Sequence, residues 1–433
     1  MNNPNLNPNF LKISLLCLIS IFPLTIVFRS AAINTSAIII SIITLYYICK
    51  KINFFFIKDN FIIYLTFFLL FIFLNTVLHF ENFKLLIKSI GNFRYLLLSI
   101  GVVIALSGMS KINKKIFIYL NLILVLFVGF DIFYQYTFNQ NILGFTPGMC
   151  AKNLTNCTRF SGIFGSELIA GAFISQIGLL NFFLLDHLEL KNKNFNRLTK
   201  IIYGLFLFIV ILLTGERSAL IIFIISFFFY FYFNKKMVIF LLLSFFFIFI
   251  LILMSQNFNS IQTRYINLLD GWGSKKEITI KQKIINSPWS YHYQAAFELF
   301  LKKPILGHGP KSFRIKCKDT EIEKKIIENK DYYLDYRSCS THPHSYVMEF
   351  LSEHGIIGFL FFAILFLKIL FILFKSKNLS TTNNNIHLTI GIGSLLLAII
   401  FPLKPSGAFF TTFNASILFY IFGFFLYFLR NIK

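Results

Sequence analysis

The sequence predicts an all-α polytopic membrane protein with about twelve transmembrane helices. Three observations support this fold class. Hydrophobic residues make up 56% of the 433 residues, and the mean hydropathy is +0.71, more than a soluble protein can bury. The apolar residues fall in runs close to the ~20 residues that a helix needs to cross a bilayer. Lysine and arginine are distributed unevenly between alternate connections, as they are in membrane proteins.

Twelve apolar runs along the chain are predicted to cross the membrane. Their residue ranges are 10–28, 31–49, 60–78, 93–108, 116–134, 162–185, 200–214, 217–233, 237–254, 356–374, 387–403 and 409–429. The runs 93–108 and 200–214 are the shortest. The ninth and tenth runs are separated by one long polar loop, which is large enough for a mostly helical cap but small for an independent domain.

The basic residues predict the orientation of these helices. With the N-terminus in the cytoplasm, 17 lysines and arginines fall at internal helix ends and loops, and 7 fall in the short external loops. The internal set is Lys12, Lys50, Lys51, Lys58, Lys111, Lys114, Lys115, Lys191, Lys193, Arg197, Lys200, Lys235, Lys236, Lys375, Lys377, Arg430 and Lys433. The external set is Arg29, Lys84, Lys88, Lys152, Arg159, Arg217 and Lys404. This bias predicts both termini inside and the long loop outside.

The chain is therefore expected to have three parts. Residues 1–254 hold transmembrane helices 1–9, residues 255–355 form the external loop, and residues 356–433 hold helices 10–12. The formal net charge of +23 raises the question of nucleic acid. No basic soluble domain with interleaved aromatic residues is present to bind it, so we expect no nucleic-acid partner, and the topology bias accounts for the charge.

Four of the six cysteines fall in predicted external loops, and Cys17 and Cys49 fall in spans. An oxidising compartment permits two disulfides among the four, most simply Cys150–Cys157 and Cys317–Cys339. No CxxC or His/Cys spacing typical of a metal site occurs, so no metal is expected.

The candidate site lies at residues 340–358, where the long loop ends and the tenth apolar run begins. His342 and His344 flank a proline, which predicts an extended segment, and the pattern becomes helical after them. Glu349 and Glu353 are four residues apart and share a helix face. An imidazole and carboxylates at a membrane surface are typical of acid/base catalysis. The alternative is that these polar residues only end a loop and begin a helix; the whole cluster favours function.

Other features of the same region are open to two interpretations. Gly355 and Gly358 are expected to let this helix approach a neighbouring helix closely. Arg217 lies in a hairpin between two spans, where an arginine either anchors a helix by snorkelling or grips a phosphate. A Ser-Pro start predicts a helix over 287–300.

Several motifs occur together in one order. Pro304-x-x-Gly-x-Gly-x-x-x-Phe313, then His342-Pro-His-Ser and Glu353-x-Gly-x-x-Gly358, resemble the O-antigen ligase and polymerase superfamily of bacterial glycan assembly. The segment 214–219, Thr-Gly-Glu-Arg-Ser-Ala, is similar to that family's Thr-Gly-x-Arg-Ser turn, and 402–410 is similar to its Ser/Thr-Gly-Ser-Phe-Phe turn. The resemblance covers about 162–429, and a large external loop before the tenth helix also fits it.

The resemblance implies a multi-pass GT-C-like glycosyltransferase of the bacterial inner membrane, with its active site on the periplasmic side. It implies inverting transfer of a glycan from undecaprenyl pyrophosphate to a hydroxyl of lipid A–core or of a growing glycan, without metal or other cofactor. By the resemblance the catalytic position is His344. We expect His342 as the alternative base and Glu353 as an orienting or structural partner. The expected contacts to the donor pyrophosphate are Arg217, Arg264, Arg314 and His292.

Three departures from the family pattern concern these residues. Family members often carry an arginine just before the Ala-Ala helix, where the nearest residues here are Trp289 and His292. Ser345 stands where the family usually has asparagine after the catalytic histidine, and Glu216 places a carboxylate beside Arg217. Three functions compete: an O-antigen ligase, a polymerase of the same superfamily, and a transporter or flippase. Transporters usually carry ionisable residues within their spans, whereas the strongest polar cluster here lies at the outer surface. We therefore favour the ligase, then the polymerase.

Overall fold

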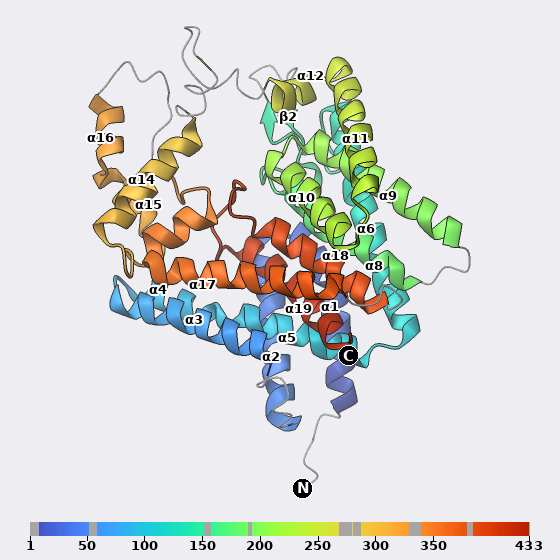
Figure 1. Ribbon diagram of the computed structural model, residues 1–433, viewed down its shortest axis with the longest axis horizontal. Helices are drawn as coiled ribbons and strands as arrows, with labels where there is room; N and C mark the ends of the chain where they lie inside the picture. Colours follow the sequence, from blue (N-terminus) through green and yellow to red (C-terminus); the bar gives the residue numbers. More distant parts are fainter. Residues whose placement is uncertain are drawn as a thin grey trace.

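The computed structural model describes residues 8–51, 59–150, 157–188, 193–267, 279, 287–328, 339–378 and 384–432. The described chain is almost entirely helical (Figure 1). The sheet that it contains is a two-stranded hairpin of β1 (Met149–Cys150) and β2 (Cys157–Arg159). Within the described residues, ten helical segments are long and apolar enough to cross a membrane, and two shorter apolar helices accompany them. The predicted all-α polytopic membrane fold is confirmed.

The helices correspond closely to the predicted spans. The longer ones are α1 (Pro8–Val27), α2 (Arg29–Lys51), α3 (Asn60–Leu78), α5 (Phe93–Gly108), α6 (Lys111–Phe138), α9 (Lys193–Thr214), α10 (Arg217–Phe233), α11 (Met237–Asn257), α17 (Tyr346–Lys377), α18 (Asn384–Ile399) and α19 (Thr412–Arg430). Helices α10 and α18 have 17 and 16 residues, which span about 25 Å, less than the ~30 Å hydrocarbon layer. The count of twelve spans therefore stays a prediction.

The predicted span 162–185 is the least regular in the structure. It consists of a 3₁₀ turn, η1 (Gly162–Phe164), followed by α7 (Ala170–Phe173), the π-helical η2 (Ile174–Gly178), α8 (Leu179–Leu184) and the 3₁₀ turn η3 (Leu185–Leu188). The continuous helix thus begins eight residues later than predicted. The predicted span 387–403 ends early, at Ile399, because Pro402 follows and disfavours helical backbone before it.

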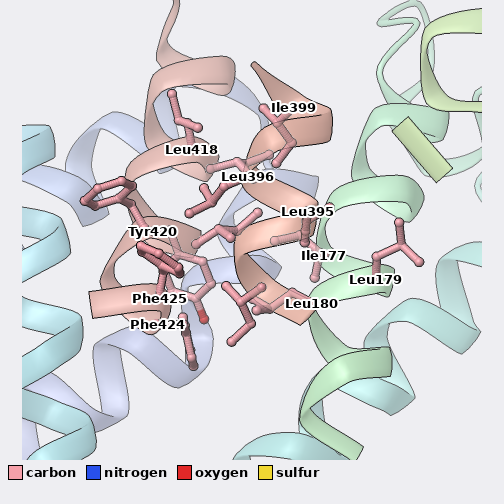
Figure 2. Packing of buried hydrophobic residues seen from close by; sticks show 14 of the residues in the cluster. Ile177, Leu179, Leu180, Leu395, Leu396, Ile399, Leu418, Tyr420, Phe424 and Phe425 are labelled. Carbon is pink, nitrogen blue, oxygen red and sulfur yellow. The ribbon is translucent and has the colours of Figure 1, made fainter. Parts of the chain in front are cut away.

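The core lies where α18 and α19 meet α5, α10 and α8. Figure 2 shows Tyr420 and Phe424 of α19 beside Leu396 of α18, with Leu180 of α8 nearby. At Gly423 a Cβ would lie 2.7 Å from the Ser99 carbonyl oxygen, so only glycine lets α19 pack this closely on α5. Helix α11 lies outside this core, and none of its membrane-crossing window is buried.

Shorter helices occupy the side of the molecule that carries the candidate site (Figure 1). They are α4 (Phe83–Gly91), α12 (Asn259–Ile261), η4 (Gln262–Ile266), α14 (Pro288–Lys302), α15 (Phe313–Lys316), η5 (Cys317–Asp319) and α16 (Glu321–Glu328). The predicted Ser-Pro helix start is confirmed, since the Ser287 side chain caps α14 by accepting from the Ser290 amide. Helices α14 and α15 pack beside the N-terminal part of α17 around a small core that includes Tyr291, Leu299 and Phe313.

Helix α17 is broken at Gly355, whose φ is 65° and ψ is −163°. The turn 304–309 lies against this break: Gly309 N donates to Glu353 O at 2.8 Å, and Ile356 N donates to Pro304 O at 2.8 Å. A Cβ on Gly355 would lie 2.3 Å from the Ile305 carbonyl oxygen. Our expectation of a close neighbour at Gly355 is met, but the neighbour is this turn and not a helix.

Both predicted disulfides are present, Cys150–Cys157 and Cys317–Cys339. The second disulfide joins Cys339, which lies just before His342 and His344, to the small core of α14 and α15, where Cys317 is fully buried. Replacing Cys317 and Cys339 by serine is expected to lower the free energy of unfolding by about 3 kcal/mol, because the bond closes a 22-residue separation. A thermal unfolding midpoint in detergent measures the effect, and the Cys150/Cys157 double serine variant, with its shorter loop, is expected to lose less. Free thiols at both positions in a non-reduced digest would contradict the prediction.

The predicted orientation of the membrane helices is tested with single accessible cysteines. Lys303 lies in the turn after α14, and the charge bias predicts that this turn is outside. Lys235 lies in the α10–α11 turn, which the charge bias predicts to be inside. Both lysines are exposed. With Cys17 and Cys49 replaced by alanine, a membrane-impermeant maleimide applied to intact cells is expected to label Lys303→Cys and not Lys235→Cys. The opposite pattern would reverse the topology.

Candidate functional site

Three of the predicted site residues form a histidine cluster. The ring centroids of His342 and His344 are 4.1 Å apart, and those of His344 and His292 are 5.1 Å apart. His292 comes from α14, while the other two precede α17. The cap helix and the histidine segment thus bring together imidazoles that are about 50 residues apart in the sequence.

The backbone of His344 is fixed from three directions. Its φ is 56°, a left-handed conformation that is uncommon outside glycine and persists only where the surroundings enforce it. Its carbonyl oxygen accepts from the Ser406 amide at 3.0 Å and from the Tyr293 hydroxyl at 3.5 Å. Ser345 then caps α17 by accepting from the Met348 amide. The direction of the imidazole is therefore set by α14, α17 and the 402–410 turn.

Burial keeps the imidazoles of His342 and His344 neutral. It lowers the pKa of His344 to about 3, with further lowering from His342 and His292, and it lowers the pKa of His342 to about 4, with His292 adding to the effect. The Thr341 hydroxyl lies 2.9 Å from His342 Nδ1. At neutral pH both rings are unprotonated and able to accept a proton.

The carboxylates of α17 hold loops. Both oxygens of Glu349 accept from the Phe409 amide, at 3.2 and 2.9 Å. Glu353 accepts from the amides of Lys311 at 2.6 Å and Phe313 at 3.4 Å. Among the described residues, no hydrogen bond joins Glu353 to His342 or His344. Of the two roles expected for Glu353, the contacts favour the structural one.

The other two histidines near the site are engaged in packing. His308 Nε2 lies 3.0 Å from the Leu299 carbonyl oxygen, and the ring is buried. His354 is also buried, with Nδ1 3.1 Å from Asn75 Oδ1 on α3. These contacts tie the turn 304–309 to α14 and α17 to α3. Neither histidine joins the cluster.

A second cluster consists of three arginines around the α9–α10 turn. Arg217 Nε donates to the Arg264 carbonyl oxygen at 2.8 Å, and Arg264 Nε donates to the Gly215 carbonyl oxygen at 3.0 Å. Arg159 comes from β2: a Cβ on Gly215 would lie 3.3 Å from its Cγ and 3.4 Å from the Cγ of Arg264. Gly215, with a φ of 65°, lets the three chain segments meet.

The arginine cluster carries excess positive charge. Glu216 accepts from the amides of Gly171 at 2.9 Å and Ala172 at 3.2 Å, at the start of α7. Burial raises the pKa of Glu216 to about 7, and the charges of Arg159 and Arg264 only partly oppose this. Burial and then the charge of Arg159 lower the pKa of Arg264. An anion placed among these guanidinium groups would relieve their repulsion and form charge-assisted hydrogen bonds.

Arg314 lies apart from the arginine cluster. It lines a cavity of about 740 Å³ together with Lys311, Lys88 and His342, and no described atom of Arg217 or Arg264 lines that cavity. The structure therefore brings Arg217 and Arg264 together but places Arg314, the third predicted arginine, near the histidine segment.

Two functional candidates were absent from our sequence-based prediction. Arg159 was counted only as an external charge, although its position two residues after Cys157 was a signal that the disulfide fixes its backbone. Lys404 is buried in the turn that holds His344, its Nζ is 5.4 Å from the centre of the Tyr346 ring, and burial lowers its pKa to about 8. A lysine between two prolines reads as an exposed turn residue, so the sequence contained no signal for its burial.

Residues 202–363 match the family model of the O-antigen ligases. The matched segment contains the histidine cluster, Arg217, Arg264 and Arg314, while Arg159 and the 402–410 turn lie outside it. No curated protein matches the sequence. Residues 202–363 thus match the O-antigen ligase domain, and this match supports the O-antigen ligase superfamily as the family of the chain.

Proposed function

We propose that this multi-pass membrane protein is an O-antigen ligase. It transfers a completed glycan from undecaprenyl pyrophosphate to a sugar hydroxyl of lipid A–core, on the periplasmic side of the bacterial inner membrane. The family supports a ligase- or polymerase-type role in glycan assembly. The observation that carries the proposal is the half-buried, neutral His344, held in a fixed backbone conformation beside His342 and His292.

The arginine cluster is the proposed site of the donor pyrophosphate. Arg159, Arg217 and Arg264 present planar donor groups from three chain segments, and hydrogen bonds to backbone carbonyl oxygens hold Arg217 and Arg264 in place. In the reaction the bond between the sugar anomeric carbon and the phosphate oxygen breaks, and the leaving pyrophosphate gains negative charge. Preorganised guanidinium groups stabilise that charge in a partly dry site.

His344 is the proposed general base. Its imidazole takes the proton of the acceptor hydroxyl while that oxygen attacks the anomeric carbon from the face opposite the pyrophosphate. A single displacement of this kind inverts the configuration of the sugar and requires no covalent intermediate. Glu349 and Glu353 act through the loops that they hold, not on the substrates.

Deletion of the gene in its native host distinguishes the candidate functions. A ligase deletion removes all long-chain lipopolysaccharide from the gel, whereas a polymerase deletion leaves core carrying one repeat. Purified protein in vesicles with lipid-linked donor and lipid A–core then tests for transfer directly. Movement of the donor across the bilayer without transfer would establish a transporter instead.

A further inference from the structure

A basic cavity lies next to the histidine cluster and is separate from the arginine cluster. Its walls include Lys88 of α4, Arg94 of α5, Lys311 of the turn before α15, and Arg314 of α15. His342 lines the same cavity, and its ring is 4.1 Å from that of His344. A ligand in this cavity would therefore lie close to the proposed base.

The positive charge of the cavity is not cancelled by its two acidic residues. The carboxylates of Glu349 and Glu353 are buried and accept hydrogen bonds from backbone amides. Burial lowers the pKa of Lys311, and the positive charges of Lys88 and Arg314 lower it further. The negative charges of Glu353 and Glu349 raise this pKa, but their effects are smaller. The cavity therefore presents a net positive potential, and an anionic group is the ligand that it suits.

The basic groups are held by the fold. Arg94 donates to Gly91 O at 2.7 Å, to Asn34 Oδ1 at 3.0 Å and to Tyr95 Oη at 2.6 Å, which makes it a fixed charge on one wall. Lys311 has a φ of 61°, and Glu353 binds its amide. The strained backbone and the buried carboxylate together fix the backbone from which the Lys311 side chain extends into the cavity wall.

Part of the remaining wall is apolar and exposed. Ile87 and Ile90 of α4 line the cavity beside Lys88, and both are more than half exposed. Exposed apolar side chains of this kind suit contact with the hydrocarbon of lipids. A ligand with both phosphate groups and acyl chains matches a cavity with this combination of surfaces.

We propose that this cavity binds a phosphate group of a membrane-anchored acceptor glycolipid and thereby brings the acceptor hydroxyl to the histidine cluster. The inference rests on the proposed function and adds the site that binds the acceptor and the group by which the acceptor is recognised. Two substrates with anionic groups must be bound in one reaction. On the predicted external side, the described residues form a basic site that contains His342 and another that contains Arg217. Lys88, Lys311 and Arg314 are then acceptor-binding residues, and Arg314 is reassigned from donor to acceptor.

The test compares binding of phosphorylated and dephosphorylated acceptor glycolipid to purified protein in vesicles, without donor. Lys311→Gln and Lys88→Gln are each expected to weaken binding of the phosphorylated acceptor by about tenfold or more, because each loses a charge-assisted contact. Lys84→Gln is the matched control, since Lys84 is exposed on the same helix as Lys88 and does not line the cavity. Dephosphorylated acceptor is expected to bind weakly, and equally to all variants. In transfer assays the KM for acceptor rises while donor binding is unchanged.

Three results would overturn the proposal. Equal losses with both forms of the acceptor would mean that the lysines do not recognise phosphate. Loss of donor binding in Lys311→Gln would assign the cavity to the pyrophosphate. A loss that depends on the phosphatidylglycerol content of the vesicles, rather than on acceptor phosphate, would assign it to a phospholipid headgroup. If wild-type protein binds the acceptor as expected but transfers nothing, the proposed function fails and the cavity assignment stands.

Discussion

His344→Ala is expected to lower the rate of glycan transfer by about 10²–10⁴-fold while leaving donor binding intact. Alanine removes the proton acceptor, whereas the arginine cluster that is proposed to bind the pyrophosphate comes from other segments of the chain. The measurement uses purified protein in vesicles, with single-turnover transfer and equilibrium binding of the lipid-linked donor recorded on the same preparation.

Matched variants separate His344 from its neighbours. His342→Ala and His292→Ala each leave the His344 backbone contacts in place and are expected to have milder effects on the transfer rate. His308→Ala removes a buried imidazole that lies outside both the cluster and the basic cavity, and it controls for loss of stability alone. Near-normal turnover by His344→Ala together with an inactive His342→Ala would move the base two residues upstream.

The acid limb of the pH–rate profile gives a second test of the same assignment. A base works only in its unprotonated form, and the lowered pKa of His344, about 3, keeps the imidazole neutral well below the usual histidine range. The value of kcat/KM, which reports the free enzyme, is therefore expected to stay flat from pH 7 down to about pH 5. A midpoint near the ordinary histidine value of about 6.5 would contradict a buried neutral cluster.

The profile of kcat is expected to differ from that of kcat/KM. The pyrophosphate of a bound donor is negatively charged and favours the imidazolium form, so it raises the pKa of His344 in the complex. That shift brings the base closer to the working pH, where general-base catalysis is most efficient. An acid limb of kcat at higher pH than that of kcat/KM is the expected result.

Sequence alone was sufficient for the membrane helices because their signal is local. An apolar run such as 237–254 carries its own length and hydropathy, and the structure has α11 at that place. The Ser-Pro start of α14 is local too, since the cap and the helix are adjacent in the chain. Where the span 162–185 departs from a regular helix, the cause is tertiary: the first α7 amides are bound by Glu216, about 45 residues away.

The site was only partly predictable because its decisive contacts are long-range. Glu353 shares a helix face with Glu349, as the spacing predicted, yet the two carboxylates bind different loops. Glu353 binds the amide of Lys311, 42 residues earlier in the sequence, and Glu349 binds the amide of Phe409, 60 residues later. Arg159 joins Arg217 and Arg264 through β2, which no local pattern connects to the α9–α10 turn. Motif spacing identified the residue types, and only the fold shows which of them meet.

The second large effect is expected at Arg217, where substitution by lysine separates its two interpretations. A lysine snorkels as well as an arginine, so a membrane anchor would tolerate the change. A pyrophosphate-binding arginine would not, because lysine keeps the charge but lacks the planar fork that binds two oxygens at once. Lysine also has no Nε to donate to the Arg264 carbonyl oxygen, so the contact between α10 and η4 is lost.

Arg217→Lys is therefore expected to weaken donor binding by about 10- to 100-fold, the range for one charge-assisted hydrogen bond, and Arg217→Ala by more. Titration of lipid-linked donor against protein in vesicles measures the effect. The control is Arg197→Lys, because Arg197 is an exposed arginine at the far end of α9.

Arg264→Lys is expected to weaken donor binding as Arg217→Lys does. The reason is that Arg217 Nε donates to the Arg264 carbonyl oxygen and Arg264 Nε donates to the Gly215 carbonyl oxygen, so each side chain helps to hold the same turn. Acceptor binding is expected to be unchanged in all three variants, since none of these residues lines the basic cavity. Wild-type donor affinity in both Arg217→Lys and Arg217→Ala, with normal expression, would leave Arg217 as a membrane anchor and remove the arginine cluster from the donor site.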